Sequence, residues 1–322
     1  MRKRYIAGLI AIAAIVVVAM LAGCVDEGQV NKAEIKQMIF ASVDKIDTYK
    51  FDMDMTQEML IRNETDETKV KTENTGTATM DVTSKKMKME MTSSMETSAN
   101  AEMPGRTMDM EMYLVNKTMY MKMDMGIPEL PARWTKMEMP GEYAKTWKSQ
   151  NQVNQQMELL NISEVEVLKE EMMNGVDCYV LKVTPDMEKY GKFLSEQEGM
   201  SELMQSLQQN VDIGQLIKQM SMKHWIAKDT KFPIKTEMQM KMEISSDDLI
   251  LPDAEEKFTM TSDQRTTVDF YDYNKPVTIE VPEEAESAAG YPMMPPMNMT
   301  VGNATETPMV PPVNDTEQSP ST

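Results

Sequence analysis

The chain has 322 residues, which is enough for one large domain or two small ones. It carries 33 basic and 52 acidic residues, and its net charge is −19. A surface this acidic repels nucleic-acid phosphates and anionic lipid headgroups, so the composition argues against a protein that binds nucleic acid.

Residues 1–23 predict a lipoprotein signal peptide. Three basic residues at positions 2–4 precede an apolar run over 5–20, and small residues then lead into Cys24. This order is typical of a secretory signal, and its end resembles the lipobox of bacterial and archaeal lipoproteins, whose cysteine carries the lipid. An uncleaved transmembrane anchor is the alternative, because the run is nearly long enough to span a bilayer. Both interpretations tether the rest of the chain to the extracytoplasmic face of the cell membrane.

The chain after the signal begins with a tether and a helix, followed by strands. Residues 24–30 form the tether, and apolar residues recur at helical spacing over 31–46. From residue 48 the apolar period becomes two. Apolar residues, mostly Met, alternate with polar ones in the segments 51–61, 87–91, 108–112, 119–125 and 238–244. Strict alternation indicates half-buried antiparallel strands, and short polar turns between them indicate a hairpin meander.

Helical patterns interrupt the strands at 142–160 and at 186–220, the second with a break near Gly214. Further strands are expected at 223–227, 234–244, 257–273 and 277–281. Residues 283–322 are rich in Pro, Met, Thr and Asn and hold no Lys or Arg. Such a segment buries too little apolar surface to offset its ordering entropy, so we expect a disordered tail. One domain, 31–282, lies between the tether and the tail.

Methionine is the most unusual component of the chain, with 38 residues. Its alternation gives the sheet one thioether face and one polar face. Met is either the ordinary core residue here, the wall of a cavity that adapts to apolar ligands, or a soft ligand for Cu(I). The cavity interpretation assigns ligand contacts to Met53, Met55, Met89, Met91, Met110, Met112, Met121, Met123, Met240, Met242, Trp134 and Trp225.

Cys178 and His224 are interpreted as structural residues. With Cys24 assigned to a lipid, Cys178 has no disulfide partner and lies in an alternating apolar segment, so we expect a buried small side chain. His224 is the single histidine and cannot form a catalytic triad by itself. Because the chain also lacks a Gly-rich loop, a nucleophile motif and metal-ligand spacing, we expect no enzyme, no catalytic residue, no metal and no cofactor.

Six sequons are candidate glycosylation sites on the extracytoplasmic side of the membrane. A glycan requires that the asparagine be exposed. Three of the sites fall within the expected domain and three within the expected tail: Asn63, Asn116, Asn161, Asn298, Asn303 and Asn314.

Three later stretches carry a family resemblance: NGVDCYVLKV at 174–183, HWIAKDTKFPIK at 224–235 and FYDYNKPVTIEVP at 270–282. In this order they resemble the LolA/LppX-like superfamily of lipoprotein and lipid carriers, over about residues 31–282. The resemblance implies an α+β fold, in which a curved antiparallel sheet forms an incomplete barrel around a few amphipathic helices. It also implies an apolar cavity, acyl chains or lipidated proteins as cargo, and no catalysis. No lid-fixing arginine of the family can be matched in this chain.

The sequence therefore predicts a membrane-anchored extracytoplasmic lipoprotein that holds a lipid-like ligand in a Met-lined cavity. Its expected partners are membrane lipid through Cys24, and a hydrophobic small molecule, an acyl chain or a lipidated protein in the cavity. We expect a monomer. The alternative is a surface or adhesion-type lipoprotein whose core is filled.

Overall fold

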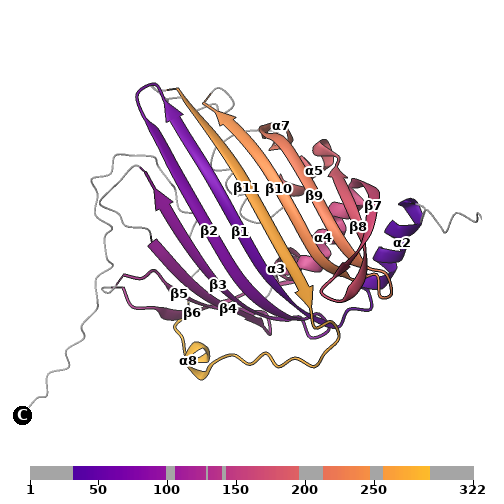
Figure 1. Cartoon of the computed structure of the whole chain (residues 1–322). Coiled ribbons are helices and arrows are strands. Elements are labelled where there is room, and N and C mark those ends of the chain that lie inside the picture. The colour runs from indigo at the N-terminus through magenta and orange to yellow at the C-terminus, as the bar shows by residue number, and fades with distance from the viewer. Residues whose placement is uncertain are drawn as a thin grey trace, which may run out of the picture.

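The computed structural model describes residues 32–98, 106–127, 130–139, 143–195, 213–246 and 257–290. Within these residues, eleven strands form one large curved antiparallel sheet (Figure 1). The strands are β1 (Thr48–Asn63), β2 (Glu67–Asp81), β3 (Lys86–Thr97), β4 (Arg106–Val115), β5 (Thr118–Asp124), β6 (Arg133–Glu138), β7 (Ser163–Met173), β8 (Val176–Pro185), β9 (Ile217–Ala227), β10 (Pro233–Ser245) and β11 (Phe258–Tyr271).

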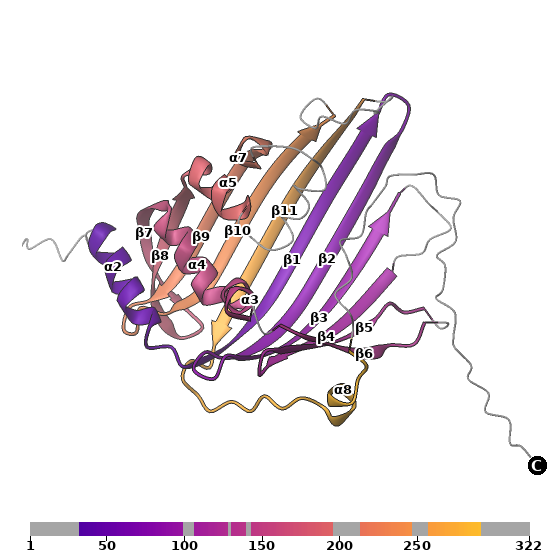
Figure 2. The same cartoon turned by 180° about the vertical axis from the view of Figure 1, so that it is seen from behind.

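The described helices are few and short. They are α2 (Lys32–Val43), α3 (Tyr143–Gln150), α4 (Gln152–Asn161), α5 (Met187–Ser195), α7 (Ile213–Leu216) and α8 (Glu283–Glu286). Figure 2 shows α3, α4 and α5 in front of one face of the sheet. The fold therefore has a broad sheet with a partial helical layer on one side.

The strand order is β6-β5-β4-β3-β2-β1-β11-β10-β9-β8-β7. The first six strands are consecutive neighbours, which confirms the expected meander. β1 also pairs with β11, where Phe51 lies opposite Phe270. Among the described strands, β6 and β7 are the two edges and do not pair with each other. The sheet is thus open and curved, and the expected incomplete barrel is observed only in this coarser form.

Alternation along β1 defines the two faces of the sheet. Tyr49 and Phe51 are buried on the side where the helices lie, and the Tyr49 hydroxyl donates a hydrogen bond of 2.9 Å to Asn151 Oδ1 at the start of α4. We call this side the helix face. Lys50 and Asp52 point to the opposite side, which we call the outer face, because successive residues of a strand alternate.

The helix face carries the two larger core clusters. The first joins the aromatic rings of β1 and β11 to α3 and α4, and its Phe51 and Phe270 ring centroids lie 6.1 Å apart. The second packs Ile39 of α2 and Leu160 of α4 against β8 and β9, where Leu181 is fully buried. Each such side chain contributes about 1.5–3 kcal/mol through apolar burial. These clusters hold the helices against the sheet.

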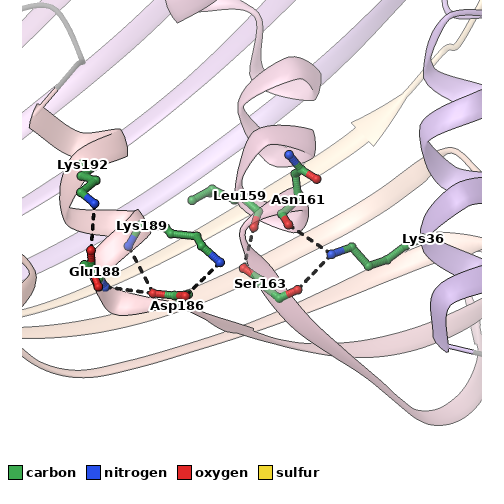
Figure 3. A network of polar contacts seen from close by, with 8 residues as sticks. All are labelled: Lys36, Leu159, Asn161, Ser163, Asp186, Glu188, Lys189 and Lys192. Atoms are coloured by element: carbon green, nitrogen blue, oxygen red, sulfur yellow. Dashed lines mark hydrogen bonds and ion pairs between the residues drawn. The ribbon is translucent and has the colours of Figure 1, made fainter.

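Figure 3 shows two groups of polar contacts, one between α2 and the end of α4 and one at the start of α5. Lys36 Nζ donates hydrogen bonds to the carbonyl oxygens of Asn161, at 3.3 Å, and Ser163, at 3.0 Å, where α4 passes into β7. Asp186 accepts from the backbone amide of Lys189 at 3.2 Å and so caps α5. Burial, with a smaller contribution from the charge of Lys189, lowers the pKa of Lys36. Lys36 thus fixes the end of α4 relative to α2, and Asp186 stabilises the first turn of α5.

Both expected helical regions differ from the observed elements. The region 142–160 forms two helices, because Asn151 caps α4 by accepting from the backbone amide of Asn154 at 3.2 Å. The region 186–220 contains α5 and α7, whereas residues 196–212 lie outside the described part. β9 already begins at Ile217, so the prediction of helix up to residue 220 is wrong.

The strand expected at 277–281 is also wrong within the described pairings. Proline at positions 276 and 282 supplies no N–H for a ladder at either end. The segment instead packs on the outer face, where Ile279 is 7% exposed and belongs to a cluster with Tyr113 and Val115.

The first residues of the expected disordered tail have a defined structure. Residues 283–290 include α8, in which Ala285 is fully buried. Lys136 Nζ of β6 donates to the Glu286 carbonyl oxygen at 2.9 Å, and Figure 1 shows α8 beside β6. The boundary placed at residue 282 is therefore too early. Residues 291–322 lie outside the described part.

Candidate ligand-binding face and cavity

All ten methionines assigned to ligand contact lie on the helix face. Met53 and Met55 share the parity of Tyr49 on β1. Residues that lie directly opposite each other on neighbouring strands share a face, so the register extends this parity over the sheet. It places on the same side Met89, Met91, Met110, Met112, Met121, Met123, Met240 and Met242.

These thioethers differ in how they are packed. Met112 is buried, at 7% exposure, and the other nine are half-buried. Met53 and Met89 contact the first core cluster, and Met240 and Met242 contact the second. On β3 and β4, Met91 lies directly opposite Met110, with an expected Cβ separation of about 5 Å. The face thus combines core packing with partly exposed methionine side chains, and Cu(I) binding stays one of the three alternatives for the methionines.

The two tryptophans assigned to the cavity lie on the outer face, so that prediction is wrong. The ring of Trp134 lies 5.9 Å from the ring of Tyr113 in the outer-face cluster with Ile279. Trp225 packs with Cys178 and Val180, also on the outer face. Each tryptophan has the opposite parity to the residues of the helix face on its strand. Aromatic character alone suggested a cavity, whereas the strand register decides the side.

One cavity lies between the helix face and the helices α4 and α5, with a volume of about 290 Å³. This value lies just below the range of about 300–1,000 Å³ for ligand pockets. The sheet supplies Met53, Met55, Met222, Thr236, Met238, Gln264, Thr266 and Val268, and the helices supply Gln152, Gln155, Gln156, Leu159, Tyr190, Phe193 and Leu194.

Only two of the expected contact residues, Met53 and Met55, line this cavity. The sequence reasoning missed Met222 and Met238, although Met238 shares the parity of Met240 on β10 and could have been found by that signal. The glutamines of α4 were not foreseen, since their pattern in the sequence indicated only a loose amphipathic helix. The remaining methionines belong to the same face but lie outside the cavity.

Two further hollows open mainly on the outer face, and their linings are charged. The hollow of about 650 Å³ is lined by Asp52, Asp54, Glu90, Asp109, Glu111, Lys122 and Asp124 together with uncharged residues that include Met53, Met91 and Met110. The hollow of about 830 Å³ includes Glu58, Lys69, Lys71, Glu96, Lys241 and Asp263. Charged groups lose hydration when an apolar molecule covers them. The outer face is therefore less suited to an apolar ligand than the helix face.

His224 and Cys178 are packed residues, as expected from the sequence. His224 is fully buried, its Nδ1 lies 3.2 Å from Thr236 Oγ1, and burial lowers its pKa to about 4. Cys178 is a free, fully buried thiol, and burial raises its pKa. A raised pKa disfavours the reactive thiolate. Neither side chain lines the cavity.

The candidate modification sites are only partly described. Asn116 and Asn161 are exposed, whereas Asn63 is half-buried in the β1–β2 turn and its Oδ1 accepts from the Asp66 amide at 2.6 Å. The signal peptide 1–23, Cys24, the tether and the sequons at Asn298, Asn303 and Asn314 lie outside the described residues. None of the helices in the described part is long and apolar enough to cross a membrane.

Comparisons with solved structures return distant similarities. The chain is 8% identical to the lipoprotein LppX of Mycobacterium tuberculosis, with a TM-score of 0.35, over 79% of this chain and 100% of that one. It is 10% identical to LprF of Mycobacterium bovis, with a TM-score of 0.38, over 78% and 97%. A DUF1329 family protein of Desulfovibrio piger matches at 12% identity and a TM-score of 0.26, over 77% and 95%.

No curated protein matches this sequence. A family model, however, matches residues 31–290, which covers most of the chain and all of the described strands. That match extends past the domain boundary expected at residue 282 and includes α8. The chain therefore belongs to DUF6612, a family of unknown function.

Proposed function

We propose that this protein is a membrane-anchored, extracytoplasmic binding protein that holds an apolar ligand between the helix face and the helices α4 and α5. The observation that carries the proposal is the cavity of about 290 Å³ lined by Met53, Met55, Met222 and Met238. The half-buried methionines of β3, β4 and β5 extend the same apolar face beyond it. The role proposed is binding or carrying, without catalysis.

Methionine suits such a surface better than a rigid core. Its side chain has three rotatable bonds and a polarisable sulfur, so it adapts to ligands of different shape. Apolar burial favours binding by about 0.8 kcal/mol per methylene group. A chain of several methylene groups therefore binds without any charged contact. The second core cluster packs α4 and α5 against the sheet, and Lys36 holds the end of α4, which keeps the cavity formed.

Native mass spectrometry tests the proposal on the chain from residue 24 onward with Cys24→Ser, secreted and purified without detergent. We expect a co-purified apolar molecule, and binding of a neutral, environment-sensitive alkyl probe. Only ligand-free protein that also fails to bind the probe would overturn the proposal and leave the alternative, a surface lipoprotein whose interior is filled.

A pair of variants locates the binding. Met53→Asn combined with Met55→Asn places two amides in the cavity wall, and we expect the probe Kd to rise at least about tenfold, equivalent to about 1.4 kcal/mol. Met172→Asn on β7 is the matched control, because Met172 is 67% exposed and lies outside the cavity. Equal effects of the double variant and the control would contradict binding at this cavity.

The anchoring part of the proposal rests on the signal peptide and Cys24. A single acyl chain gives reversible membrane binding, and two or more give stable anchoring. We expect the wild-type protein to sediment with membranes and Cys24→Ser to be released. If Cys24→Ser stays with the membrane as firmly as the wild type, an uncleaved N-terminal helix is the anchor instead.

A further inference from the structure

The cavity is lined entirely by uncharged side chains. None of the residues that the structure places around it is Asp, Glu, Lys, Arg or His. This sets it apart from the outer-face hollows, which are ringed by carboxylates and ammonium groups. A charged ligand group in the cavity would lose its hydration without meeting an opposite charge there, which is strongly unfavourable.

The cavity nevertheless has polar side chains on two walls, with three glutamines on α4 and with Thr236, Gln264 and Thr266 on the sheet. Gln152, Gln155 and Gln156 of α4 lie at helical spacings of three and four, so they share one face of the helix. Gln264 stands on the sheet and donates to Met55 Sδ at 3.2 Å and to Thr266 Oγ1 at 3.3 Å. A carboxamide offers two N–H donors and one acceptor oxygen. The α4 wall therefore suits an uncharged polar group.

Gln156 carries the second observation. Its side chain lines the cavity and is 8% exposed, yet Oε1 accepts no hydrogen bond from any described residue. A buried acceptor without a donor is unfavourable, and native structures rarely leave one unsatisfied. A ligand hydroxyl or amide N–H would supply that donor after a small rotation of the terminal amide.

We propose that the cavity selects an uncharged amphiphile, such as a long-chain alcohol, an acylglycerol or a fatty amide, over a fatty acid or an alkylamine. The apolar chain lies against Met53, Met55 and Met238, and the hydroxyl or amide head contacts Gln156 on the α4 wall. This inference rests on the proposed function, since it specifies which apolar ligands the same cavity accepts.

Competition binding with four compounds of equal chain length tests the selectivity at pH 7: hexadecanol, palmitate, hexadecylamine and hexadecane. For each compound, the concentration that displaces a neutral alkyl probe from the Cys24→Ser chain is measured. We expect hexadecanol to bind at least about tenfold more tightly than palmitate and hexadecylamine. Palmitate binding as tightly as hexadecanol would overturn this inference alone, whereas displacement by none of the four, with no probe binding, would overturn the proposed function.

Substitutions at Gln156 assign the selectivity to one side chain. Gln156→Leu should weaken the binding of hexadecanol about tenfold and leave the binding of hexadecane unchanged. The control Gln219→Leu, at an exposed glutamine of β9, should alter the binding of neither compound. Gln156→Glu adds a carboxylate of similar size, and we expect it to improve hexadecylamine binding at least about tenfold. Unchanged hexadecanol binding in Gln156→Leu, or no gain for the amine in a folded Gln156→Glu, would contradict the assignment.

Discussion

At the scale of single residues, Tyr49 joins the sheet to α4. Its hydroxyl donates to Asn151 Oδ1 at 2.9 Å in a fully buried position, and burial raises its pKa. Tyr49→Phe removes that donor from the cap of α4. We expect the free energy of unfolding in urea to fall by about 1–2 kcal/mol. Tyr271→Phe removes the hydroxyl that donates to Asp52 at a 38% exposed site, and its effect should stay within about 0.5 kcal/mol.

His224 makes the stability depend on pH. Its pKa is about 4 in the folded chain and about 6.5 when unfolded. Between these values the unfolded chain binds more protons, so stability falls as the pH falls through this window. Lowering the pH from 7 to 5 should cost about 2 kcal/mol through this residue. Urea unfolding of the wild type and of His224→Gln at both pH values measures this loss. The carboxylates titrate in both proteins, so the difference between the two losses of stability reports His224. Equal losses in the two proteins would contradict the prediction.

Parity explains which site residues the sequence predicts correctly. Met53 and Met91 alternate with acidic or polar neighbours, so their shared face is visible in the sequence, and the strand register then brings them to one side. Trp225 stands between His224 and Ile226, where polarity does not alternate. The sequence therefore offers no pattern that places its ring on the outer face. Gln156 escaped notice because an orphaned acceptor becomes visible only once its neighbours are placed.

At the scale of elements, two hairpin turns differ by one residue type. The β7–β8 turn uses Asn174 and Gly175, with φ of 53° and 82°, whereas the β4–β5 turn uses Asn116 and Lys117, with φ of 53° and 66°. Positive φ strains a side chain such as Lys more than it strains Gly. Lys117→Gly should therefore raise the unfolding free energy by about 0.5–1 kcal/mol.

The matched change is Gly175→Lys, which should lower the unfolding free energy by about 1 kcal/mol. Thermal and urea unfolding of the two variants measure the pair of effects. Shifts of the same sign would show that side-chain contacts outweigh backbone strain in these turns.

The missed elements share a physical cause. β2 is rich in Thr, Glu and Lys, and Ala78 and Met80 are among its few buried apolar residues. Its position between β1 and β3 supplies the hydrogen bonds that its own pattern does not indicate. Pairing with the two neighbouring strands thus determined what the periodicity within β2 could not. The edge strand β6 was missed because it is too short to show a clear alternation.

At the scale of the whole molecule, the segment after β11 covers part of the outer face. Ile279 is 7% exposed and packs in the cluster of Tyr113 and Trp134. Ile279→Ala should lower the unfolding free energy by about 2 kcal/mol and alter tryptophan fluorescence. Thr278→Ala, at an exposed neighbouring position, should do neither. A loss of stability without any change in tryptophan fluorescence would contradict packing of Ile279 in the cluster with Trp134.

The pairing of β1 with β11 has a consequence for the order of assembly. Lys50 lies opposite Tyr271, and the register runs over fourteen positions to Asn63 and Phe258. A chain delivered through a translocation channel from its N-terminus exposes β1 long before β11 has emerged. During that time the backbone N–H and C=O groups on one edge of β1 are unpaired and can pair with another extended chain. Unpaired β1 carries a row of negative charges at Asp52, Asp54 and Glu58. Because like-charged chains repel each other, these charges oppose pairing between two copies of β1.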